Sequence, residues 1–400
     1  MSGLTAEEAA GRLGVKVATL YAYVSRGVLR RWNEPGSRLS LFDPEEVEAL
    51  ARRGRPRRAS PPLALDLVVR TSLTVIGDRD FRYRGVSALG LARTASFEEV
   101  ANWLWTGQRS SEHRPWPATP LPLPEVGSAR DRLRLAVVLM SASDPLRADL
   151  SAPAVVDRGC RLIAAMAGAV SSHGGVAGEP LCLPAGGPAL PGTVAGRLWH
   201  GLGGTPPNQR LVAALNAALV LLADHELAAS TLAARVAASA RADPYAVVLA
   251  GLGPMSGALH GGASRLAREL LEAAAATGPE PALARATETH GHPPGFGHRL
   301  YPAGDPRARL LLEMTRAAAP RHLFTRVADR LIETARQRAG VEPNVDFALA
   351  LLTMVARMPP EAGEIVFTVA RTAGWLAHAL EEYGEPPLRF RARAVARALR

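Results

Sequence analysis

The chain has 400 residues, which is long enough for two or three domains and a sizeable core. Its 48% hydrophobic residues exclude a disordered chain, and abundant alanine with only 5% aromatics favours a helical body. The net charge is +10, and Lys16 is the only lysine. Such a basic chain either meets an anionic partner such as nucleic acid or reflects a genome that prefers arginine.

Several further classes are argued against by the sequence. Cys160 and Cys182 are the only cysteines and form no CxxC pair, so neither a disulfide framework nor a zinc site is expected. Residues 1–14 lack the basic-then-apolar order of a signal peptide. The longest apolar run, Leu211–Ala223, is interrupted by Asn216 and is too short to cross a bilayer. We therefore expect a cytoplasmic protein.

Residues 1–59 have the pattern of a small helical module. Thr5 and Glu8 form a capping box that opens a short helix, and Gly14 ends it. A second helix is expected over 17–25. Two short helices joined by a turn have the spacing of a helix-turn-helix motif.

The rest of this module predicts a hairpin and a third helix. Pro35-Gly36 marks a turn between two short extended runs. Asp43-Pro44-Glu45-Glu46 then places acidic residues at the positive end of a helix. The basic, Pro/Gly-broken run over 52–61 is expected to be the linker to a second domain over 62–400.

This order of elements resembles the N-terminal DNA-binding domain of MerR-type regulators and excisionases. The resemblance implies contacts with DNA through side chains of the second helix, its flanks and the hairpin, namely Lys16, Thr19, Tyr21, Arg26 and Arg38. The alternative is a helical module that serves only dimer contacts or regulation.

From about residue 62 the pattern becomes one of Ala- and Leu-rich helices. A short hairpin is expected around Gly77–Asp80, and Ser96 opens a helix that ends at Gly107. Further helices are expected over 129–142, 152–170, 208–223 and 226–240. The Gly- and Pro-rich stretch Ser171–Pro207 predicts a long loop, in which His173 and His200 have no expected role.

Three segments of the C-terminal half carry polar groups against this apolar background. His260 stands between glycines just before an amphipathic run, where the positive end of a helix favours a neutral imidazole that can donate a hydrogen bond. His298 and Arg307 lie in a Gly- and Pro-rich stretch and offer a proton donor and a carboxylate clamp. Asp346 places a carboxylate at the start of an apolar helix. Taken singly, these residues have structural explanations, such as a histidine in a glycine turn or a helix N-cap.

Together these segments resemble the citrate synthase family, along which most of residues 62–393 can be laid. The motifs that carry the resemblance stand in the family's order: Asp224-His225-Glu226, Gly297-His298-Arg299, Asp305-Pro306-Arg307, Asn344-Val345-Asp346-Phe347 and Ala370-Arg371-Thr372-Ala373-Gly374-Trp375. The resemblance implies an all-α, dimeric body of two lobes that closes over its substrate. The large lobe would cover 62–261 and 359–400, and the small lobe 262–358.

The resemblance also implies an activity, the Claisen condensation of oxaloacetate with acetyl-CoA or propionyl-CoA, with release of CoA and without a cofactor or metal. Asp346 would remove the proton, His260 would stabilise the enol and His298 would act as the acid. Oxaloacetate would be held by His225, Arg307, Arg371 and Arg391, the last reaching the site of a partner subunit. CoA would be bound by Pro294, Gly295, Phe296, Gly297 and Arg299.

Some positions depart from the family pattern. Leu222 stands where the family often has His, Ala228 where it often has Asn, and the final arginine motif at 391–396 has Ala at two positions. These changes leave the three catalytic groups in place and concern substrate affinity and acyl-CoA choice. The fused N-terminal module motivates an alternative function, that of a DNA-binding transcriptional regulator whose synthase-like body senses a metabolite.

Overall fold

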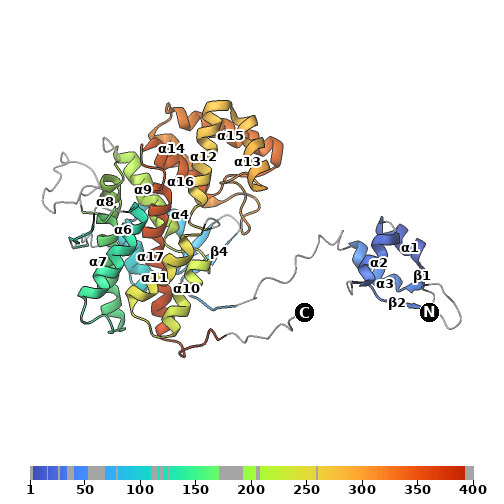
Figure 1. Cartoon of the computed structure of the whole chain (residues 1–400), viewed down its shortest axis with the longest axis horizontal. Coiled ribbons are helices and arrows are strands. Elements are labelled where there is room, and N and C mark those ends of the chain that lie inside the picture. Colours follow the sequence, from blue (N-terminus) through green and yellow to red (C-terminus); the bar gives the residue numbers. More distant parts are fainter. Residues whose placement is uncertain are drawn as a thin grey trace. The chain divides into compact units, whose positions relative to one another are not determined.

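The chain divides into two units, Met1–Arg70 and Thr71–Arg400 (Figure 1). Each unit has a buried apolar core of its own. The computed structural model describes residues 3–15, 17–25, 28–33, 40–52, 68–77, 80–109, 116–117, 120–124, 127–170, 192–203, 208–257 and 260–391.

The first unit combines three helices with a small antiparallel sheet. The helices are α1 (Ala6–Leu13), α2 (Val17–Ser25) and α3 (Pro44–Arg52), and the sheet has the order β1 (Leu4–Thr5), β3 (Ser40–Phe42), β2 (Arg31–Asn33). The capping box of Thr5 and Glu8 is present, and Gly14 ends α1 with a φ of 62°. Leu20, Phe42 and Val47 are fully buried in the core of this unit. The three predicted helices and the predicted hairpin are confirmed, whereas the short strand β1 was not predicted.

In its described residues, the second unit is helical apart from one antiparallel sheet. The sheet has the order β4 (Thr74–Ile76), β5 (Phe81–Tyr83), β6 (Val86–Ser87), and β4 and β5 form the predicted hairpin. The helices are α4 (Ala88–Thr94), α5 (Phe97–Thr106), α6 (Ala129–Ser143), α7 (Ala152–Gly168), α8 (Val194–Gly201), α9 (Gln209–Leu222), α10 (Ala229–Ser239), α11 (Pro244–Met255), α12 (Ala263–Thr277), α13 (Pro279–His290), α14 (Pro306–Ala318), α15 (Leu323–Ala339), α16 (Val345–Val355) and α17 (Ala362–Tyr383).

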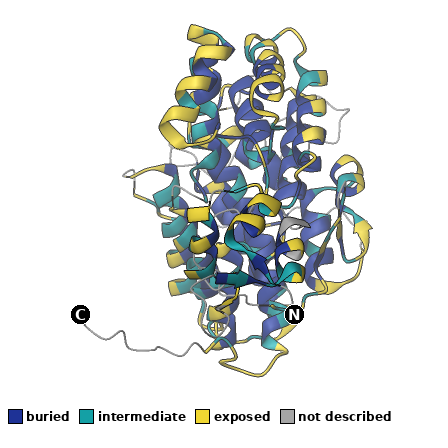
Figure 2. Cartoon of the chain, turned by 90° about the vertical axis from the view of Figure 1, so that its right-hand side faces the viewer, coloured by how far each residue is buried: buried dark blue, intermediate teal, exposed yellow. Residues whose placement is uncertain are grey.

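Helix α17 is the central element of this unit. It packs against α5, α7, α9, α10 and α11 (Figure 1), and most of its residues are buried. Figure 2 shows the buried residues of the chain in dark blue on the inner parts of the helices. Small residues allow the close packing: a Cβ on Gly251 of α11 would lie 2.6 Å from the ring of Trp375. The buried faces of α9 and α17 consist largely of Ala, Leu and Val, as the composition predicted.

Helices α12 to α16 pack mainly against one another and gather at one end of the unit (Figure 1). Helices α14 and α16 also contact α9, and α12 and α16 contact α17. This group of helices occupies the segment expected to form the small lobe. The lobe boundaries at 262 and 358 stay a prediction.

The predicted loop over Ser171–Pro207 was wrong in part, because residues 194–201 form α8. Thr193 caps this helix, and its apolar residues Val194, Leu198 and Trp199 are buried. Gly196 and Gly201 gave the segment a loop-like composition, but burial of one apolar face outweighs the low helix propensity of glycine. Within the part of the chain that the structure describes, no helix is long and apolar enough to cross a membrane.

Candidate active site

Four loop-to-helix junctions of the second unit bring the predicted polar residues together. His225 follows α9, His260 precedes α12, Arg307 lies in the first turn of α14, and Asp346 lies in the first turn of α16. Arg371 reaches the same region from the middle of α17, and its charge acts on both His260 and Asp346.

The loop that carries His298 is fixed to the start of α16. The backbone N–H of Gly297 donates to the carbonyl of Glu342 at 2.8 Å, and the N–H of Asn344 donates to the carbonyl of Gly295 at 2.8 Å. Gly295 has a φ of 80°, and a Cβ there would lie 2.9 Å from the Cβ of Phe347 on α16. The two segments therefore approach closely only because this position is glycine.

Asp305 connects Arg307 to the same helix start. Its carboxylate accepts hydrogen bonds from Nε and Nη2 of Arg307 at 3.0 and 2.8 Å, and from the backbone N–H of Val345 at 3.0 Å. Burial opposes ionisation of Asp305, but the charge and hydrogen bonds of Arg307 outweigh it and hold the pKa of the carboxyl below its usual value. Arg307 is almost fully buried, and Asp305 holds its guanidinium in one orientation.

His225 is buried beside Tyr301 and His298. Its Nε2 lies 2.9 Å from the hydroxyl of Tyr301, and its ring centroid lies 5.7 Å from that of His298. Burial lowers the pKa of His225, and the charges of Arg307 and Arg371 lower it further. Burial raises the pKa of Tyr301 to about 12. Both groups are therefore neutral at physiological pH and interact as hydrogen-bonding groups, not as an ion pair.

His298 has donors on both sides of its ring. The backbone N–H of Leu300 donates to Nδ1 at 3.2 Å, and Nη2 of Arg307 lies 3.2 Å from Nε2. Burial, with the charge of Arg307 next in size, lowers the pKa of His298 and favours the neutral ring. A neutral ring that accepts at Nδ1 carries its proton on Nε2. Because a guanidinium only donates, Nε2 does not hydrogen-bond to Arg307 in that tautomer, and the two N–H donors, 3.2 Å apart, are left for an acceptor of a ligand. With the proton on Nδ1 instead, Nε2 would accept from Arg307.

His260 is half-buried and contacts a residue of α10. The hydroxyl of Ser230 lies 2.8 Å from Nε2 of His260, and the ring of Phe367 lies 6.0 Å away between centroids. Burial and, after it, the charge of Arg371 lower the pKa of His260. If Ser230 donates to Nε2, the ring proton lies on Nδ1, which makes no hydrogen bond among the described residues.

Asp346 is not the cap of its helix. The side chain of Asn344 caps α16 by accepting from the N–H groups of Asp346 and Phe347 at 3.0 and 3.4 Å. The Asp346 carboxylate has no hydrogen bond or ion pair among the described residues. Burial raises its pKa to about 6 in spite of the nearby charges of Arg307 and Arg371. The explanation of this carboxylate as a helix N-cap is therefore wrong.

Arg371 is only 1% exposed. Its Nε donates to the carbonyl of Leu222 at 2.8 Å, and its guanidinium lies 4.8 Å from the ring centroid of Phe367. Burial lowers the pKa of Arg371, yet an arginine stays charged in proteins. Within the described residues it makes no ion pair, and the charge that acts on it most is that of the Asp224 carboxylate.

The other predicted ligand-binding residues lie at the edge of this site or away from it. Pro294, Gly295 and Phe296 are buried, whereas Gly297 is exposed. Arg299 is largely exposed and lies 3.9 Å from Glu226. Arg391 is exposed and is the last residue described, so its expected reach to a partner subunit stays a prediction.

The residues expected to contact DNA lie in the first unit and are only partly described. On α2, Thr19 is half-buried and Tyr21 is exposed. The guanidinium of Arg31 lies 5.8 Å from the ring centroid of Tyr21. Lys16, Arg26 and Arg38 lie outside the described residues.

Sequence reasoning missed Ser230 and Tyr301 and gave Asp305 no role. Tyr301 lies three residues after His298 in the motif stretch, so its proximity was a signal that could have been used. Ser230 is 30 residues from His260, and no local pattern connects them. Among the described residues, no group of three or more His, Cys, Asp or Glu side chains could hold a metal ion.

Comparison with known proteins places this geometry in a family. Residues 66–393 match the family model of the C-terminal domain of citrate synthase. The fold is similar to that of the solved citrate synthase of the archaeon Thermoplasma acidophilum, with a TM-score of 0.68 and 25% identity over 84% of this chain and 95% of that chain. That structure is a ternary complex with carboxymethyl coenzyme A and oxaloacetate. The citrate synthase of Thermotoga maritima gives the same TM-score of 0.68 at 24% identity, over 85% of this chain and 96% of that chain.

Two relatives illustrate the range of similarity. Citrate synthase 2 of Bacillus subtilis is 35% identical over 194 residues, which are 48% of this chain and 52% of that protein. The 2-methylcitrate synthase 1 of Corynebacterium glutamicum is 27% identical over 323 residues, which are 75% of this chain and 85% of that protein. The chain thus spans about half the length of relatives such as the Bacillus protein. It belongs to the citrate synthase family.

Proposed function

We propose that this protein condenses oxaloacetate with acetyl-CoA or propionyl-CoA and releases CoA. The observation that carries the proposal is the grouping of one unpaired carboxylate, Asp346, with two buried arginines and three histidines of lowered pKa. The proposal concerns Claisen chemistry, which needs a base, a group that stabilises an enol and an acid at the acceptor carbonyl.

Oxaloacetate is a dianion, and Arg371 and Arg307 are suited to bind its carboxylates. Arginine forks bind carboxylates bidentately, and burial strengthens the attraction because little water screens it. The ion pair of Arg307 with Asp305 leaves N–H groups of Arg307 for a ligand. His225, held by Tyr301, supplies a further neutral hydrogen-bonding group. Arg391 of one subunit would complete the site of its partner in a homodimer.

Proton removal is assigned to Asp346 and stabilisation of the enol to His260. The carboxylate of Asp346 takes a proton from the carbon next to the thioester, and the electron pair moves to the thioester oxygen. A pKa of about 6 makes Asp346 a better proton acceptor than an ordinary aspartate while it remains mostly ionised at pH 7. His260, with Ser230 on Nε2, donates from Nδ1 to the developing enol oxygen.

We assign carbon–carbon bond formation to the region next to Nε2 of His298 and Nη2 of Arg307, which lie 3.2 Å apart. The enol carbon attacks the keto carbon of oxaloacetate, whose oxygen gains negative charge. A keto oxygen between Nε2 of His298 and Nη2 of Arg307 would accept hydrogen bonds from both, and His298 would then supply the proton. Water hydrolyses the thioester of the product and gives the CoA thiol and a free carboxylate.

The CoA moiety is assigned to the loop Pro294–Gly297 and to Arg299. The exposed guanidinium of Arg299 offers a cation for a phosphate. The N–H of Gly297 is taken by Glu342, but its carbonyl, which accepts from Nδ2 of Asn344, keeps a second lone pair for an adenine. The choice between acetyl-CoA and propionyl-CoA stays open, since relatives named for both products match this chain.

The test is thiol release by the purified full-length protein with oxaloacetate and either acetyl-CoA or propionyl-CoA. We expect release that depends on oxaloacetate and disappears in Asp346→Ala, and the faster thioester identifies the substrate. A folded protein that releases no thiol with either thioester contradicts the enzyme proposal.

A second function, binding of DNA by the first unit, is favoured by its two-helix motif and β2–β3 hairpin. Exposed Tyr21 with Arg31 beside its ring, together with Lys16, Thr19, Arg26 and Arg38, would contact the duplex. Sequence-specific binding that weakens steeply with salt and is lost in Lys16→Ala or Arg26→Ala supports this function. Specific DNA binding without any turnover would make the protein a metabolite-sensing regulator.

A further inference from the structure

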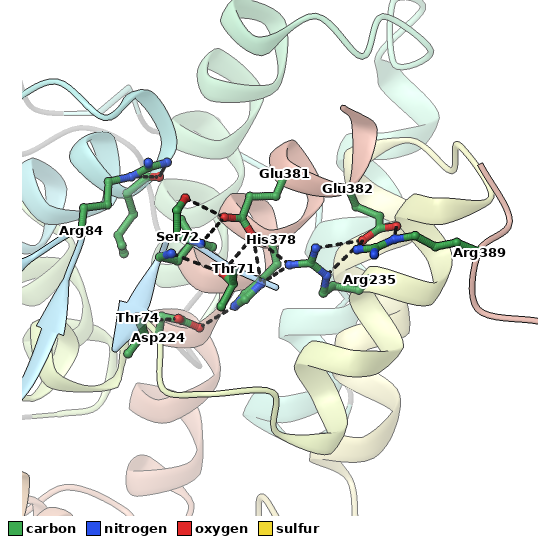
Figure 3. Close-up of polar contacts among 12 residues, drawn as sticks. Thr71, Ser72, Thr74, Arg84, Asp224, Arg235, His378, Glu381, Glu382 and Arg389 are labelled. Carbon is green, nitrogen blue, oxygen red and sulfur yellow. Dashed lines mark hydrogen bonds and ion pairs between the residues drawn. The ribbon is translucent and has the colours of Figure 1, made fainter. Parts of the chain in front are cut away.

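A chain of buried polar contacts runs from Asp224, the residue before His225, to Arg235 and Glu382 (Figure 3). Asp224, Arg235, His378 and Glu382 are each at most 1% exposed. Nη1 of Arg235 lies 2.7 Å from Nδ1 of His378, and Nε2 of His378 lies 3.2 Å from Oδ1 of Asp224. The contacts join the end of α9, the middle of α10 and the last turns of α17, which are far apart in the sequence.

The direction of these hydrogen bonds follows from the arginine. A guanidinium can only donate, so Nδ1 of His378 accepts from Arg235. The ring proton therefore lies on Nε2 and is donated to Asp224. Asp224 also accepts a short hydrogen bond from the hydroxyl of Thr74 on β4. Two donors on different elements thus fix the orientation of the Asp224 carboxylate.

Carboxylates hold Arg235 in the position from which it donates. Its Nε donates to Glu382 at 3.0 Å, and its Nη1 also donates to Glu381 at 2.9 Å. Glu382 in turn accepts two hydrogen bonds from Arg389, at 2.6 and 2.7 Å. Rotation of Arg235 away from His378 would break these contacts as well.

The backbone of the turn is fixed by the same face of α17. Arg371 donates to the carbonyl of Leu222, and Gly374 faces the carbonyl of Ala223 so closely that a Cβ would lie 2.3 Å from that oxygen. Arg371, Gly374 and His378 are spaced by three and four residues and so share one side of the helix. His225 is the next residue after this clamped segment.

Stability alone is a weak explanation for such a chain of buried polar groups. Burying charges carries a large desolvation cost, and well-packed apolar residues often give equal or greater stability. A hydrogen-bonded chain does, however, hold side chains in one geometry, as positioning of binding groups requires. The contacts end on the residue next to His225, which the proposed function assigns to oxaloacetate.

We propose that His378 and Arg235 are positioning residues for oxaloacetate binding, acting through Asp224 on the turn that carries His225. This inference rests on the proposed function. We call the hydrogen-bonded chain Arg235–His378–Asp224 the relay. Neither Arg235 nor His378 contacts substrate in this scheme, so loss of the relay weakens oxaloacetate binding more than it slows the chemical step. Among the described residues, no hydrogen bond joins Arg235 or His378 to His260 or Asp346, so we expect the affinity for acyl-CoA to stay unchanged.

The test compares His378→Phe with His378→Gln. Phenylalanine keeps a planar ring but can neither accept from Arg235 nor donate to Asp224. The glutamine amide can do both, because its oxygen accepts and its nitrogen donates. We expect His378→Phe to raise the KM and Kd for oxaloacetate about tenfold, with KM for acyl-CoA unchanged, and His378→Gln to recover most of the affinity.

A second pair of variants changes Thr74 on β4, which donates to Asp224. This pair tests the same role if His378→Phe folds poorly. Thr74→Val removes the hydroxyl that Asp224 accepts from and keeps the shape, whereas Thr74→Ser keeps the hydroxyl. We expect weaker oxaloacetate binding only in Thr74→Val. Tyr383→Phe on α17 is the matched control, since it deletes a 2.7 Å hydrogen bond to the carbonyl of Ala242 outside the relay.

The outcomes separate this inference from the proposed function. Wild-type affinity for oxaloacetate in both His378→Phe and Thr74→Val overturns the positioning role, as does equal loss in His378→Phe and His378→Gln. Binding is measured by calorimetry with oxaloacetate alone and does not depend on turnover. A wild-type protein that binds oxaloacetate but releases no thiol therefore contradicts the proposed condensation, while the role of the relay in binding can still be tested. A wild-type protein that binds no oxaloacetate overturns both.

Discussion

Gly374 of α17 faces the carbonyl oxygen of Ala223, and a Cβ at this glycine would lie 2.3 Å from that oxygen and 2.9 Å from Oδ1 of Asp224. Both atoms belong to a clamped turn that cannot move aside without breaking other hydrogen bonds. The contact explains why the middle of a buried helix has glycine in spite of its low helix propensity.

Gly374→Ala is therefore expected to displace the 223–225 turn, to destabilise the protein by about 2 kcal/mol or more and to weaken oxaloacetate binding. Thermal unfolding and calorimetry with oxaloacetate measure the two effects. Gly253→Ala on α11 is the control, because a Cβ there meets no atom within 4 Å and we expect a neutral or slightly stabilising change. Unchanged binding in a well-folded Gly374→Ala protein would contradict this explanation.

The pKa of Asp346 predicts the pH dependence of turnover. Burial raises this pKa from 3.8 to about 6, and only the ionised carboxylate can accept the substrate proton. We expect kcat/KM for the acyl-CoA to fall about tenfold per pH unit below about pH 6 and to be level from about pH 7 to 8, since the site histidines have lowered pKa values and are already neutral there. A profile from pH 5 to 8 measures it, and a level kcat/KM down to pH 5 would contradict the assignment.

The same pKa predicts that loss of the base stabilises the fold. The folded pKa of about 6 lies above the value of 3.8 expected when unfolded, so the stabilising contribution of protonated Asp346 is full below pH 3.8 and is lost as pH rises through 6. Asp346→Asn, neutral at every pH, should raise the free energy of unfolding at pH 7.5 by about 1–3 kcal/mol while abolishing turnover. Urea unfolding at pH 7.5 and pH 5.0 should show the gain shrinking at the lower pH.

Asp305→Asn is the matched comparison with the opposite sign. The pKa of Asp305 is lowered, so its ionised form stabilises the fold above its unfolded pKa. Its amide variant should therefore be less stable than the wild type at pH 7.5. Two aspartates with opposite outcomes would separate the effect of burial from a general effect of removing charge.

The hydrogen bond between Ser230 and Nε2 of His260 favours the tautomer with its proton on Nδ1. Ser230→Ala removes the hydroxyl 2.8 Å from Nε2 and should lower kcat by roughly tenfold with little change in KM for oxaloacetate. Ser230→Thr keeps the hydroxyl and should retain most activity. Thr231→Val is the control, since the buried hydroxyl of Thr231 has no hydrogen-bond partner among the residues that the structure describes. If Ser230→Ala and Thr231→Val turn over equally well, Ser230 does not act on His260.

Local signals of the sequence predicted much of the helical framework. The capping boxes at Thr5 and Ser96 involve residues three positions apart, and both helices begin where these boxes predicted. Gly107 ends α5 as predicted because it adopts a φ of 70°. Helix α8 was missed because its glycines resemble a loop, and only the buried surface that covers its apolar face explains its stability.

Contacts between distant residues could not be predicted in this way. His378 meets Asp224 across 154 positions, and Ser230 meets His260 across 30. The resemblance to a family pointed to His225 and His298 but not to the groups that hold them, since a motif marks positions and not their neighbours. The cap of α16 shows the same limit: whether Asn344 or Asp346 caps the helix depends on backbone angles that the sequence alone does not give.

Replacing Ala228 by a capping residue should stabilise the start of α10. Ala228 occupies the N-cap with a φ of −58° and a ψ of 160° and makes no side-chain cap hydrogen bond. Asn and Ser accept from the free N–H groups of a first turn, so both Ala228→Asn and Ala228→Ser should raise the free energy of unfolding by about 1 kcal/mol. Ala228→Val, which cannot cap, should give no gain.

Asn is also the residue expected near oxaloacetate in this family, so Ala228→Asn alone should lower the KM for oxaloacetate. Equal KM values for Asn and Ser would limit position 228 to helix capping, and a lower KM only with Asn would make Ala228 a determinant of substrate affinity.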